Sequence, residues 1–440
     1  MQRLLVGELI KWKERQDRKP LIIKGVRQCG KTFALKSFGA EHYADVAYFN
    51  FEETPALGQR FEQDLDPRRI ITELGVLRGK VIQPASTLLI FDEIQFCPKA
   101  LTALKYFSEA VPEYHLTCAG SLLGIALKET SSFPVGKVDF LTMRPMSFYE
   151  FVLASDQPML LDYIDQLEDN LPIPQIFTDK LETLLKAYFI VGGMPEAVNK
   201  WFTSQEIAEV ERIQDLILNS YELDFAKHAP PSDFPKLSLI WKSIPDQLAK
   251  ANGKFVYGHV KPGARAKDLE DALEWLICVG LVYKVCQVDK PAIPLSAYAK
   301  ANYFKLYMAD VGLLRRMARL PVEAIYSDSS LYTEFKGALT ENYVLGELIN
   351  LSGDIPYYWT SGNTAEVDFV VQMGGVIVPV EVKASTNVKS RSLKVYREKY
   401  QPPVAIKASM LNLKQDGGLV NLPLYLMWKA AAAVKIALAP

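Results

Sequence analysis

The chain has 440 residues, 49% hydrophobic and 23% charged, which predicts an ordinary globular protein of two to four domains. The formal net charge of -1 excludes an overall positive field, so any contact with nucleic acid would depend on local basic patches. No C-x-x-C pair and no histidine pair at metal-ligand spacing occurs, which argues against zinc and leaves carboxylates, and therefore Mg²⁺ or Mn²⁺, for any metal chemistry.

The N-terminus and the apolar stretches predict no membrane contact. Residues 1–13 form an expected short amphipathic helix without a signal-peptide core. The apolar stretches at residues 87–91 and 376–380 are far shorter than the ~20 residues that span a bilayer. With five cysteines in no disulfide-like pattern, this predicts a soluble protein of the cytoplasm.

Residues 21–32 read LIIKGVRQCGKT, an apolar strand that runs into a glycine-bounded loop and ends in lysine and threonine. This pattern indicates a phosphate-binding loop, because Gly25 and Gly30 let successive backbone N–H groups converge on phosphate oxygens where the next helix begins. Lys31 is expected to reach the outer phosphates and Thr32 a Mg²⁺ ion; the alternative is a glycine turn with a solvated lysine. The predicted nucleotide-binding residues are Gly25, Val26, Arg27, Gln28, Cys29, Gly30, Lys31, Thr32, Phe33 and Asp92.

Further strands are predicted at residues 46–51, 88–91, 115–119 and 137–141, with helix-length segments between most of them. This alternation predicts a mostly parallel sheet. The strand at residues 87–91 ends in Asp92 and Glu93, at the edge of the sheet where nucleotide sites form, which is the Walker B pattern. Asp92 is expected to hold Mg²⁺ and Glu93 to polarise the attacking water; a charged strand end is the alternative.

Two polar residues follow later strands. Ser121 is expected to sense the γ-phosphate or the attacking water, or else to cap a helix from Leu122. Arg144 follows the last strand, where an arginine could stabilise phosphate charge or simply lie on the surface.

The middle of the chain is predicted to be helical. Residues 148–232 carry amphipathic runs and are expected to form a helical lid that ends at Pro230 and Pro231. Residues 233–320 then give helix, glycine and strand, the order of a winged helix, with Lys261 and Arg265 beside the candidate recognition helix. That helix also carries acidic residues, so both nucleic-acid binding and a packing role stay open.

Residues 366–371 and 376–383 alternate in polarity around Gly374 and Gly375, which predicts a β-hairpin. A turn at the two glycines sets Asp368 opposite Glu381 and Glu366 opposite Lys383. Facing carboxylates destabilise a sheet unless a cation lies between them, so the pattern favours a metal. The alternative is a hairpin with salt bridges, Glu366 to Lys383 among them.

Glu341 lies on the predicted buried face of a helix around residues 337–348, where a lone carboxylate is costly. It becomes reasonable if Glu341 shares an ion with Asp368 and Glu381, and with Lys383 these groups would suit metal-dependent nuclease chemistry. The predicted catalytic residues are Lys31, Glu93, Ser121, Asp368, Glu381 and Lys383, and the predicted metal ligands are Thr32, Asp92, Glu341, Asp368 and Glu381.

Several segments together resemble one protein family. They are GVRQCGKT from Gly25, LIFDEI from Leu89, AGSLL from Ala119, RPMSFYEF from Arg144, VGGMPE from Val191, LYMADVGLL from Leu306, TENYV from Thr340, EVDFVV from Glu366 and PVEVK from Pro379. The chain resembles prokaryotic ATPases that join an AAA+-like P-loop domain to a C-terminal domain of the PD-(D/E)XK nuclease-like class. The resemblance implies an α/β fold, ATP and Mg²⁺ at the first motif pair, and a nuclease-like site at Glu341, Asp368, Glu381 and Lys383.

The expected organisation is a P-loop ATPase domain at residues 1–147, a lid at 148–232, a winged helix at 233–320 and a nuclease-like domain at 321–440. The first functional hypothesis is an ATPase that gates metal-dependent cleavage of nucleic acid, with DNA preferred over RNA as substrate. The alternative is a nucleotide-gated signalling switch whose nuclease-like domain binds nucleic acid or a protein without cleavage. ATP and Mg²⁺ are the expected cofactors, Mn²⁺ is a second candidate for the C-terminal site, and a homo-oligomer is left open.

Overall fold

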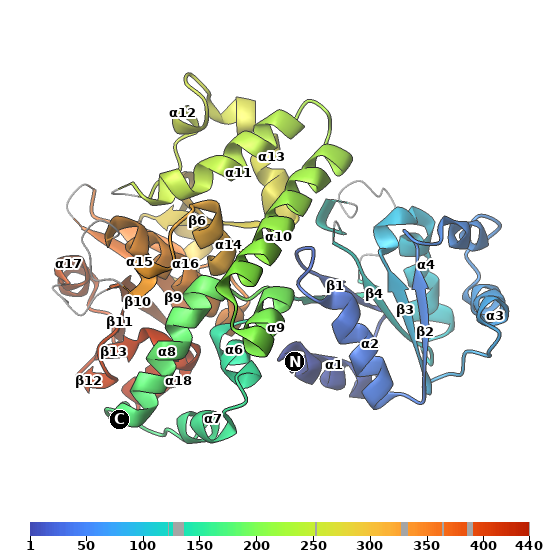
Figure 1. The fold of residues 1–440 in the computed structure, drawn as a ribbon, viewed down its shortest axis with the longest axis horizontal. Coiled ribbons are helices and arrows are strands. Elements are labelled where there is room, and N and C mark those ends of the chain that lie inside the picture. Colours follow the sequence, from blue (N-terminus) through green and yellow to red (C-terminus); the bar gives the residue numbers. More distant parts are fainter. Residues whose placement is uncertain are drawn as a thin grey trace. The chain divides into compact units, whose positions relative to one another are not determined.

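The computed structural model describes residues 1–121, 123–125, 136–250, 253–326, 333–362, 365–384 and 390–439. The chain divides into two compact units (Figure 1). The N-terminal unit comprises Gln2–Arg144 with Cys278–Gly280, and the C-terminal unit comprises Pro145–Ile277 and Leu281–Pro440 with Met1. The helix start expected at Leu122 lies outside the described residues.

The N-terminal unit is built on a parallel sheet with the strand order β2-β3-β4-β1-β5. Its strands are β1 Leu21–Lys24, β2 Asp45–Asn50, β3 Thr87–Asp92, β4 His115–Ala119 and β5 Asp139–Thr142. Every residue of β3 and β4 is buried, as expected for central strands of a parallel sheet. The predicted parallel α/β sheet is therefore confirmed, with strand ends within two residues of those expected.

Helices connect these strands. They are α1 Leu5–Glu14, α2 Lys31–His42, η1 Pro55–Phe61, α3 Pro67–Arg78, η2 Ile94–Phe96 and α4 Pro98–Ala110. The sequence of α3 shows why it begins and ends where it does: Asp66 accepts a hydrogen bond from the Arg68 N–H, Pro67 occupies the first turn, and Gly79 ends the helix with a φ of 70°.

The C-terminal unit begins with a helical region. Its helices are α6 Phe148–Ala154, α7 Pro158–Asp165, α8 Gln175–Val191, α9 Pro195–Ser204 and α10 Ile207–His228. Ser147 and Glu150 form a reciprocal capping box that fixes the start of α6. In the described part of the chain, no helix combines the length and the apolar character needed to cross a membrane.

The segment expected to be a winged helix contains helices followed by an antiparallel strand pair. Its elements are α11 Phe234–Leu248, α12 Tyr257–Val260, α13 Ala266–Cys278, β6 Val282–Val288, η3 Leu295–Tyr298, β7 Ala299–Met308, α14 Val311–Met317 and, just after it, α15 Glu323–Tyr326. The remaining elements are α16 Thr333–Ser352, β8 Tyr357–Thr360, β9 Glu366–Met373, β10 Val376–Val382, α17 Arg391–Tyr400, β11 Ala405–Ser409, β12 Lys414–Asp416, β13 Leu419–Pro423, η5 Leu424–Lys429 and α18 Ala430–Leu438.

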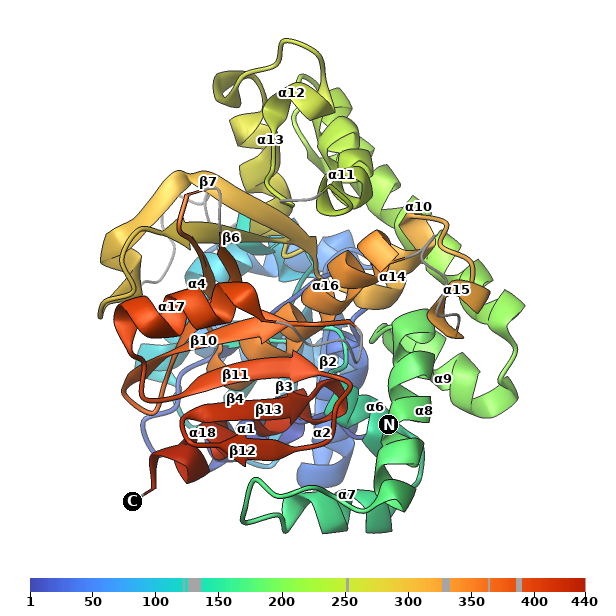
Figure 2. The same ribbon diagram turned by 90° about the vertical axis from the view of Figure 1, so that its left-hand side faces the viewer.

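These later strands form one mixed sheet in the order β12-β13-β11-β10-β9-β8-β6-β7 (Figure 2). Because β6 pairs with β8, the strands after α13 and the C-terminal strands belong to the same sheet. The expected boundary between residues 320 and 321 thus falls between strands of one sheet, and the division into four domains stays a prediction.

The hairpin of β9 and β10 has the predicted register. Its ladder runs from Met373 and Val376 at the turn to Phe369 and Val380. Gly374 and Gly375, with φ values of 58° and 81°, form the turn. The ladder ends one pair before Asp368 and Glu381.

Four of the segments that resemble the family meet inside the C-terminal unit, at a cluster that we call the glycine junction: Met146, Gly193, Met308, Asp310 and Asn342. The Met146 N–H donates to the Gly193 carbonyl (2.7 Å), and the Gly193 N–H donates to Asp310 Oδ2 (2.6 Å). The Asn342 side chain bonds both backbone groups of Met308, at 2.8 and 3.0 Å. A Cβ at Gly193 would lie 2.1 Å from the Met146 carbonyl oxygen, so only glycine fits. Close packing against Met146 therefore explains why position 193 is a glycine.

Candidate functional site

The loop between β1 and α2 depends on its two glycines. Gly25 has a φ of 149°, and a Cβ there would lie 2.0 Å from the Met143 carbonyl oxygen. Gly30 precedes α2 with a φ of 94°. The helix therefore begins at the end of the loop, where free backbone N–H groups and the helix dipole favour an anion.

Lys31 is tied to this loop. Its side chain is 7% exposed, and Nζ donates to the carbonyl oxygens of Gly25 and Val26, both at 2.8 Å. These bonds hold one positive charge at the loop that would bind phosphates.

Thr32 and Asp92 come together at the carboxyl end of β3. Thr32 Oγ1 donates to Asp92 Oδ2 over 2.8 Å, and the hydroxyl of Tyr48 donates to the same oxygen, also over 2.8 Å. A hydroxyl and a carboxylate at this edge are oxygen ligands of the kind that Mg²⁺ prefers, so the residues fit the expected ion. Burial and the hydrogen bond to Asp92 raise the pKa of Tyr48, which keeps it a donor.

Glu93 adopts a left-handed conformation with a φ of 49°. Its Oε2 accepts a hydrogen bond from Gln95 Nε2 (2.5 Å) and lies 3.5 Å from Ser121 Oγ. A left-handed backbone conformation is uncommon at a non-glycine residue, and such conformations are enriched at functional sites. The structure therefore brings the two predicted residues Ser121 and Glu93 together.

The other predicted loop residues differ in exposure. Cys29 is buried, and its Sγ lies 3.5 Å from the Met143 carbonyl oxygen, which fits a packing role. Phe33 is 63% exposed. Arg3, which the sequence did not single out, braces the loop by donating to the carbonyl oxygens of Cys29 (2.9 Å) and Arg144 (2.7 Å).

In the C-terminal unit, the carboxylates of the hairpin bind protein donors. Asp368 Oδ2 accepts the Val382 N–H (2.7 Å). Glu381 is buried and engages both oxygens, one with Lys383 Nζ (2.8 Å) and one with the Leu393 N–H (3.0 Å) at the start of α17. Lys383 therefore pairs with Glu381 and not with Glu366, contrary to the salt bridge considered from the sequence.

Glu341 and Glu366 share a different lysine. Lys305 Nζ on β7 lies 2.7 Å from Glu366 Oε1 and 3.3 Å from Glu341 Oε2. The hydroxyl of Tyr307 donates to the same Glu341 oxygen over 2.8 Å. We call this group, with Asp368, Glu381 and Lys383, the acidic centre.

Charges in the acidic centre influence one another. Burial raises the pKa of Asp368 to about 8, with the charge of Glu341 adding to the shift and Lys305 opposing it. Burial alone would lower the pKa of Lys305, but Glu341, Glu366 and Asp368 outweigh it and raise that pKa well above its ordinary value. Lys305 is accordingly an ammonium ion at neutral pH.

The contacts do not fit a divalent metal shared by Glu341, Asp368 and Glu381. Within the described ranges, no three Asp, Glu, His or Cys side chains lie close enough together to hold an ion. Each of the three carboxylates instead accepts bonds from lysine, tyrosine or backbone N–H donors. The expected Mg²⁺ or Mn²⁺ site is thus not supported by this geometry.

Family models match three parts of the chain. Residues 17–152 match a model described as AAA domain. Residues 182–324 and 336–427 match models described as domain of unknown function (DUF8612) and domain of unknown function (DUF4143). The first match covers the parallel sheet, the glycine loop and the Asp92–Glu93 pair. Residues 17–152 thus resemble AAA domains and have the α/β fold of a P-loop ATPase.

Solved structures that resemble the chain share little sequence with it. The Walker-type ATPase of Pyrococcus abyssi is 14% identical, with 71% of this chain and 94% of that chain covered and a TM-score of 0.43. AMPPCP-bound DnaA from Aquifex aeolicus is 12% identical, with 62% and 86% covered and a TM-score of 0.27. The Aeropyrum pernix ORC1 protein in complex with DNA is 14% identical, with 73% and 92% covered and a TM-score of 0.28. No curated protein matches the sequence. Likenesses this distant carry no conclusion about ligands.

Sequence patterns missed several residues of both sites. For the N-terminal unit these are Arg3, Tyr48 and Gln95. The alternation of β2 could have indicated Tyr48, because this residue lies two positions before Asn50, which pairs with Asp92. For the acidic centre they are Lys305 and Tyr307. A lysine inside the apolar run at residues 304–308 was the available signal, because a buried charge requires a partner.

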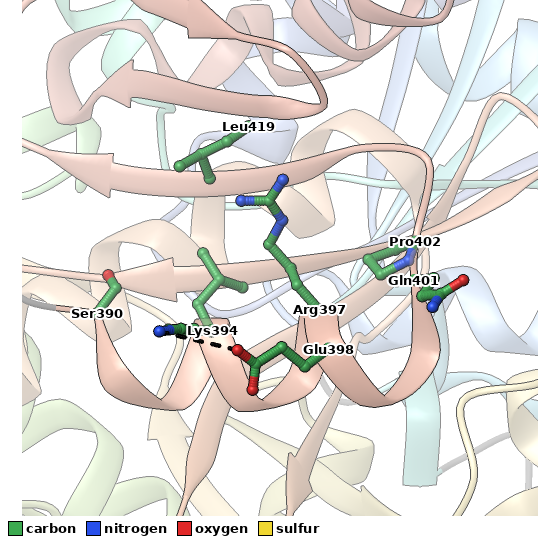
Figure 3. Close-up of a pocket in the computed structure, with 8 residues that line it drawn as sticks. Ser390, Lys394, Arg397, Glu398, Gln401, Pro402 and Leu419 are labelled. Carbon is green, nitrogen blue, oxygen red and sulfur yellow. Dashed lines mark ion pairs between the residues drawn. The ribbon is translucent and has the colours of Figure 1, made fainter.

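An open groove of about 610 Å³ lies between α17 and β13 (Figure 3). Leu393 and Arg397 line it from α17 and Leu419 from β13, while Lys394 and Glu398 pair with each other over 3.8 Å. None of the predicted site residues is among its described lining residues, although Leu393 also donates its N–H to Glu381. Mixed charge along the groove favours no ligand of one sign.

Proposed function

We propose that the chain is a Mg²⁺-dependent ATP hydrolase whose nucleotide state controls a nuclease-like C-terminal unit directed at nucleic acid, DNA in preference to RNA. The observation that carries the hydrolase part is the arrangement at the carboxyl ends of the parallel strands. Lys31 is bound to the loop, and Thr32 contacts Asp92. The carboxylate of Glu93 lies next to these groups in sequence and is contacted by Ser121 and Gln95. Side chains suited to binding phosphate, holding Mg²⁺ and orienting the attacking water therefore belong to one unit.

Roles follow from these positions. Backbone N–H groups of the loop and Lys31 would bind the phosphates, and Thr32 and Asp92 would hold Mg²⁺, which neutralises phosphate charge when bound. Glu93 would orient the attacking water and take up its proton, with Ser121 and Gln95 fixing the carboxylate.

A glutamate exchange tests the hydrolase. Glu93→Gln keeps the size and the oxygen that Gln95 and Ser121 approach but loses the base, so ATP binding should persist while turnover falls about 100-fold or more. Lys31→Ala should lose ATP affinity, and chelation of Mg²⁺ should stop turnover of the wild type. Glu113→Gln, an exposed change of identical chemistry, is the matched control. Wild-type turnover in Glu93→Gln would refute the assignment.

The backbone from Met143 to Phe148 supports control of the C-terminal unit by nucleotide. Within the N-terminal unit, the Met143 N–H donates to the Lys24 carbonyl (2.7 Å), and the Met143 carbonyl lies against Gly25. Within the C-terminal unit, the Phe148 N–H donates to Glu347 Oε1 over 2.8 Å, and Glu347 lies on α16 together with Glu341. A single short segment thus contacts the phosphate loop at one end and the helix of the acidic centre at the other.

In this proposal, residues 148–232 serve as the lid and 233–320 as a winged helix that moves with nucleotide state, in a cytoplasmic protein that could act as a homo-oligomer. Such control needs a demonstrated coupling, which cleavage and binding assays in the presence of ATP can measure.

Two outputs remain to be separated: cleavage of nucleic acid, and binding without cleavage as in a signalling switch. Lysine contacts throughout the acidic centre favour the second. Single-stranded, duplex and branched DNA and RNA should be offered with Mg²⁺ or Mn²⁺ to the wild type, Lys31→Ala and Asp368→Ala. ATP-dependent binding without cleavage supports the switch, cleavage lost in Asp368→Ala supports the nuclease, and neither binding nor cleavage refutes the nucleic-acid part.

A further inference from the structure

Lys305 belongs to the acidic centre although its partners lie on other elements of the chain. It lies on β7, and its side chain reaches a carboxylate of β9 and another of α16. The residue is 2% exposed. A lysine is rarely buried to this extent unless it is paired, so the two carboxylates are the reason that it can stay.

Neighbouring backbone covers Lys305. Lys254 forms a β-bridge with it, and the Phe255 N–H donates to the Phe304 carbonyl over 2.9 Å. The rings of Phe255 and Phe304 stack with centroids 5.3 Å apart. These contacts flank the lysine and hold its ammonium group toward Glu341 and Glu366.

We propose that Lys305 is a built-in replacement for a divalent cation: its ammonium group bridges the carboxylate of the helix, Glu341, to that of the hairpin, Glu366, and so excludes Mg²⁺ and Mn²⁺ from the acidic centre. The inference concerns the C-terminal unit alone and holds or fails independently of ATP turnover.

Two physical effects support exclusion. A metal ion bound by Glu341 would face the charge of Lys305 a short distance away, in surroundings that screen charge poorly. It would also have to displace existing donors, namely Tyr307 at Glu341, the Val382 N–H at Asp368 and both partners of Glu381. The hairpin therefore has its countercharge without any ion.

Calorimetric titration of Mn²⁺ into full-length protein without nucleotide tests the proposal. All proteins should carry Asp92→Asn, so that the AAA-type domain adds no Mn²⁺ site that depends on Asp92. The Asp92→Asn protein that retains Lys305, called the Lys305 background, should show no Mn²⁺ binding that depends on Glu341. Lys305→Met, which keeps the length and removes the charge, should bind Mn²⁺ at least about tenfold more tightly than any residual binding by the Lys305 background, and Glu341→Gln in addition should abolish that gain.

Folding is controlled with two further variants. Lys305→Arg keeps the charge and should gain no Mn²⁺ site. Lys305→Met with Glu366→Gln removes one charge of each sign, and circular dichroism and a thermal melt show whether it folds. A folded Lys305→Met protein without any gain in affinity would overturn the proposal. So would Mn²⁺ binding by the Lys305 background that is lost in Glu341→Gln, and this comparison decides the question even where the Lys305 variants fail to fold.

Discussion

Glu347 should make the stability of the C-terminal unit depend on pH. It lies on α16 and is 2% exposed; Oε1 accepts the Phe148 N–H over 2.8 Å, and Oε2 has no hydrogen-bond partner among the described residues. Burial raises its pKa from 4.5 to about 7, the charge of Glu150 adds to the shift, and the Phe148 N–H opposes it. Tyr343, whose pKa is also raised by burial, lies beside it.

The sign and the size of the effect follow from this shift. A pKa raised by folding means that the folded protein holds a proton that the unfolded chain releases between pH 4.5 and about 7. Stability from this group is therefore complete below pH 4.5, falls as the pH rises to about 7, and is constant above it. At about 1.4 kcal/mol for each pKa unit, the loss is about 3 kcal/mol.

Glu347→Gln isolates this contribution, since the amide oxygen can still accept the Phe148 N–H but no longer titrates. Urea denaturation of both proteins should be followed at pH 5, 6, 7 and 8 by circular dichroism and tryptophan fluorescence. Trp428 is a local reporter, because its ring centroid lies 5.5 Å from that of Phe148. The difference in free energy of unfolding between the variant and the wild type should shift in favour of the variant as the pH rises to 7, by about 3 kcal/mol at most. Glu168→Gln, an exposed change in the same unit, controls for general charge effects. Parallel pH profiles for Glu347→Gln and the wild type would refute the reasoning.

Three further changes have defined outcomes. Gly25→Ala places a Cβ 2.0 Å from the Met143 carbonyl oxygen and should weaken ATP binding at least about tenfold, as measured with a fluorescent nucleotide. Gly193→Ala brings a Cβ to 2.1 Å from the Met146 carbonyl oxygen and should lower the free energy of unfolding by about 1–3 kcal/mol in urea. Arg315→Met removes buried hydrogen bonds to Glu211, Gln214 and the Leu320 carbonyl, and because Glu211 keeps Arg316 as a partner it should cost about 1–3 kcal/mol in the same assay.

Matched controls exist for each change. A Cβ added at Gly7 or Gly258 would meet no atom of another described segment within 4 Å, so Gly7→Ala and Gly258→Ala should leave ATP binding unchanged and raise the free energy of unfolding by no more than about 1 kcal/mol, the helix preference of alanine. Arg212 is exposed and pairs with Glu209 on the same helix, and Arg212→Met should have an equally small effect. Equal losses in a control and its test variant would contradict the contact assigned to that test residue.

The sequence predicted the phosphate loop and the hairpin register correctly, because both depend on residues close together in the chain. The phosphate loop is one continuous segment in which glycine, lysine and threonine have fixed relative positions, so its geometry follows from neighbours in the chain. The hairpin register follows from Gly374 and Gly375, because a tight turn sets every pair beyond it.

Contacts between distant segments were out of reach of the same patterns. Lys305 meets Glu366 only because β7, β6, β8 and β9 are neighbours in one sheet, and a winged-helix interpretation of residues 233–320 gave no reason to connect them. The metal expected in the acidic centre was inferred without these contacts: Glu381 pairs with Lys383 of the same motif, and Glu341 and Glu366 receive their cation, Lys305, from a strand outside it.

Because β6 and β8 belong to one sheet, the segment that matches a family model, residues 336–427, is not the same as a segment that can fold alone. A protein cut to residues 336–427 would keep the hairpin and most of α16 but would lose β6, the strand that covers the edge of β8. Its acidic centre would lose Lys305 and keep Glu341 and Glu366. An uncovered strand edge invites pairing with other chains, and unbalanced carboxylates oppose collapse, so such a fragment should aggregate or stay unfolded. Recombinant C-terminal fragments should therefore begin before β6.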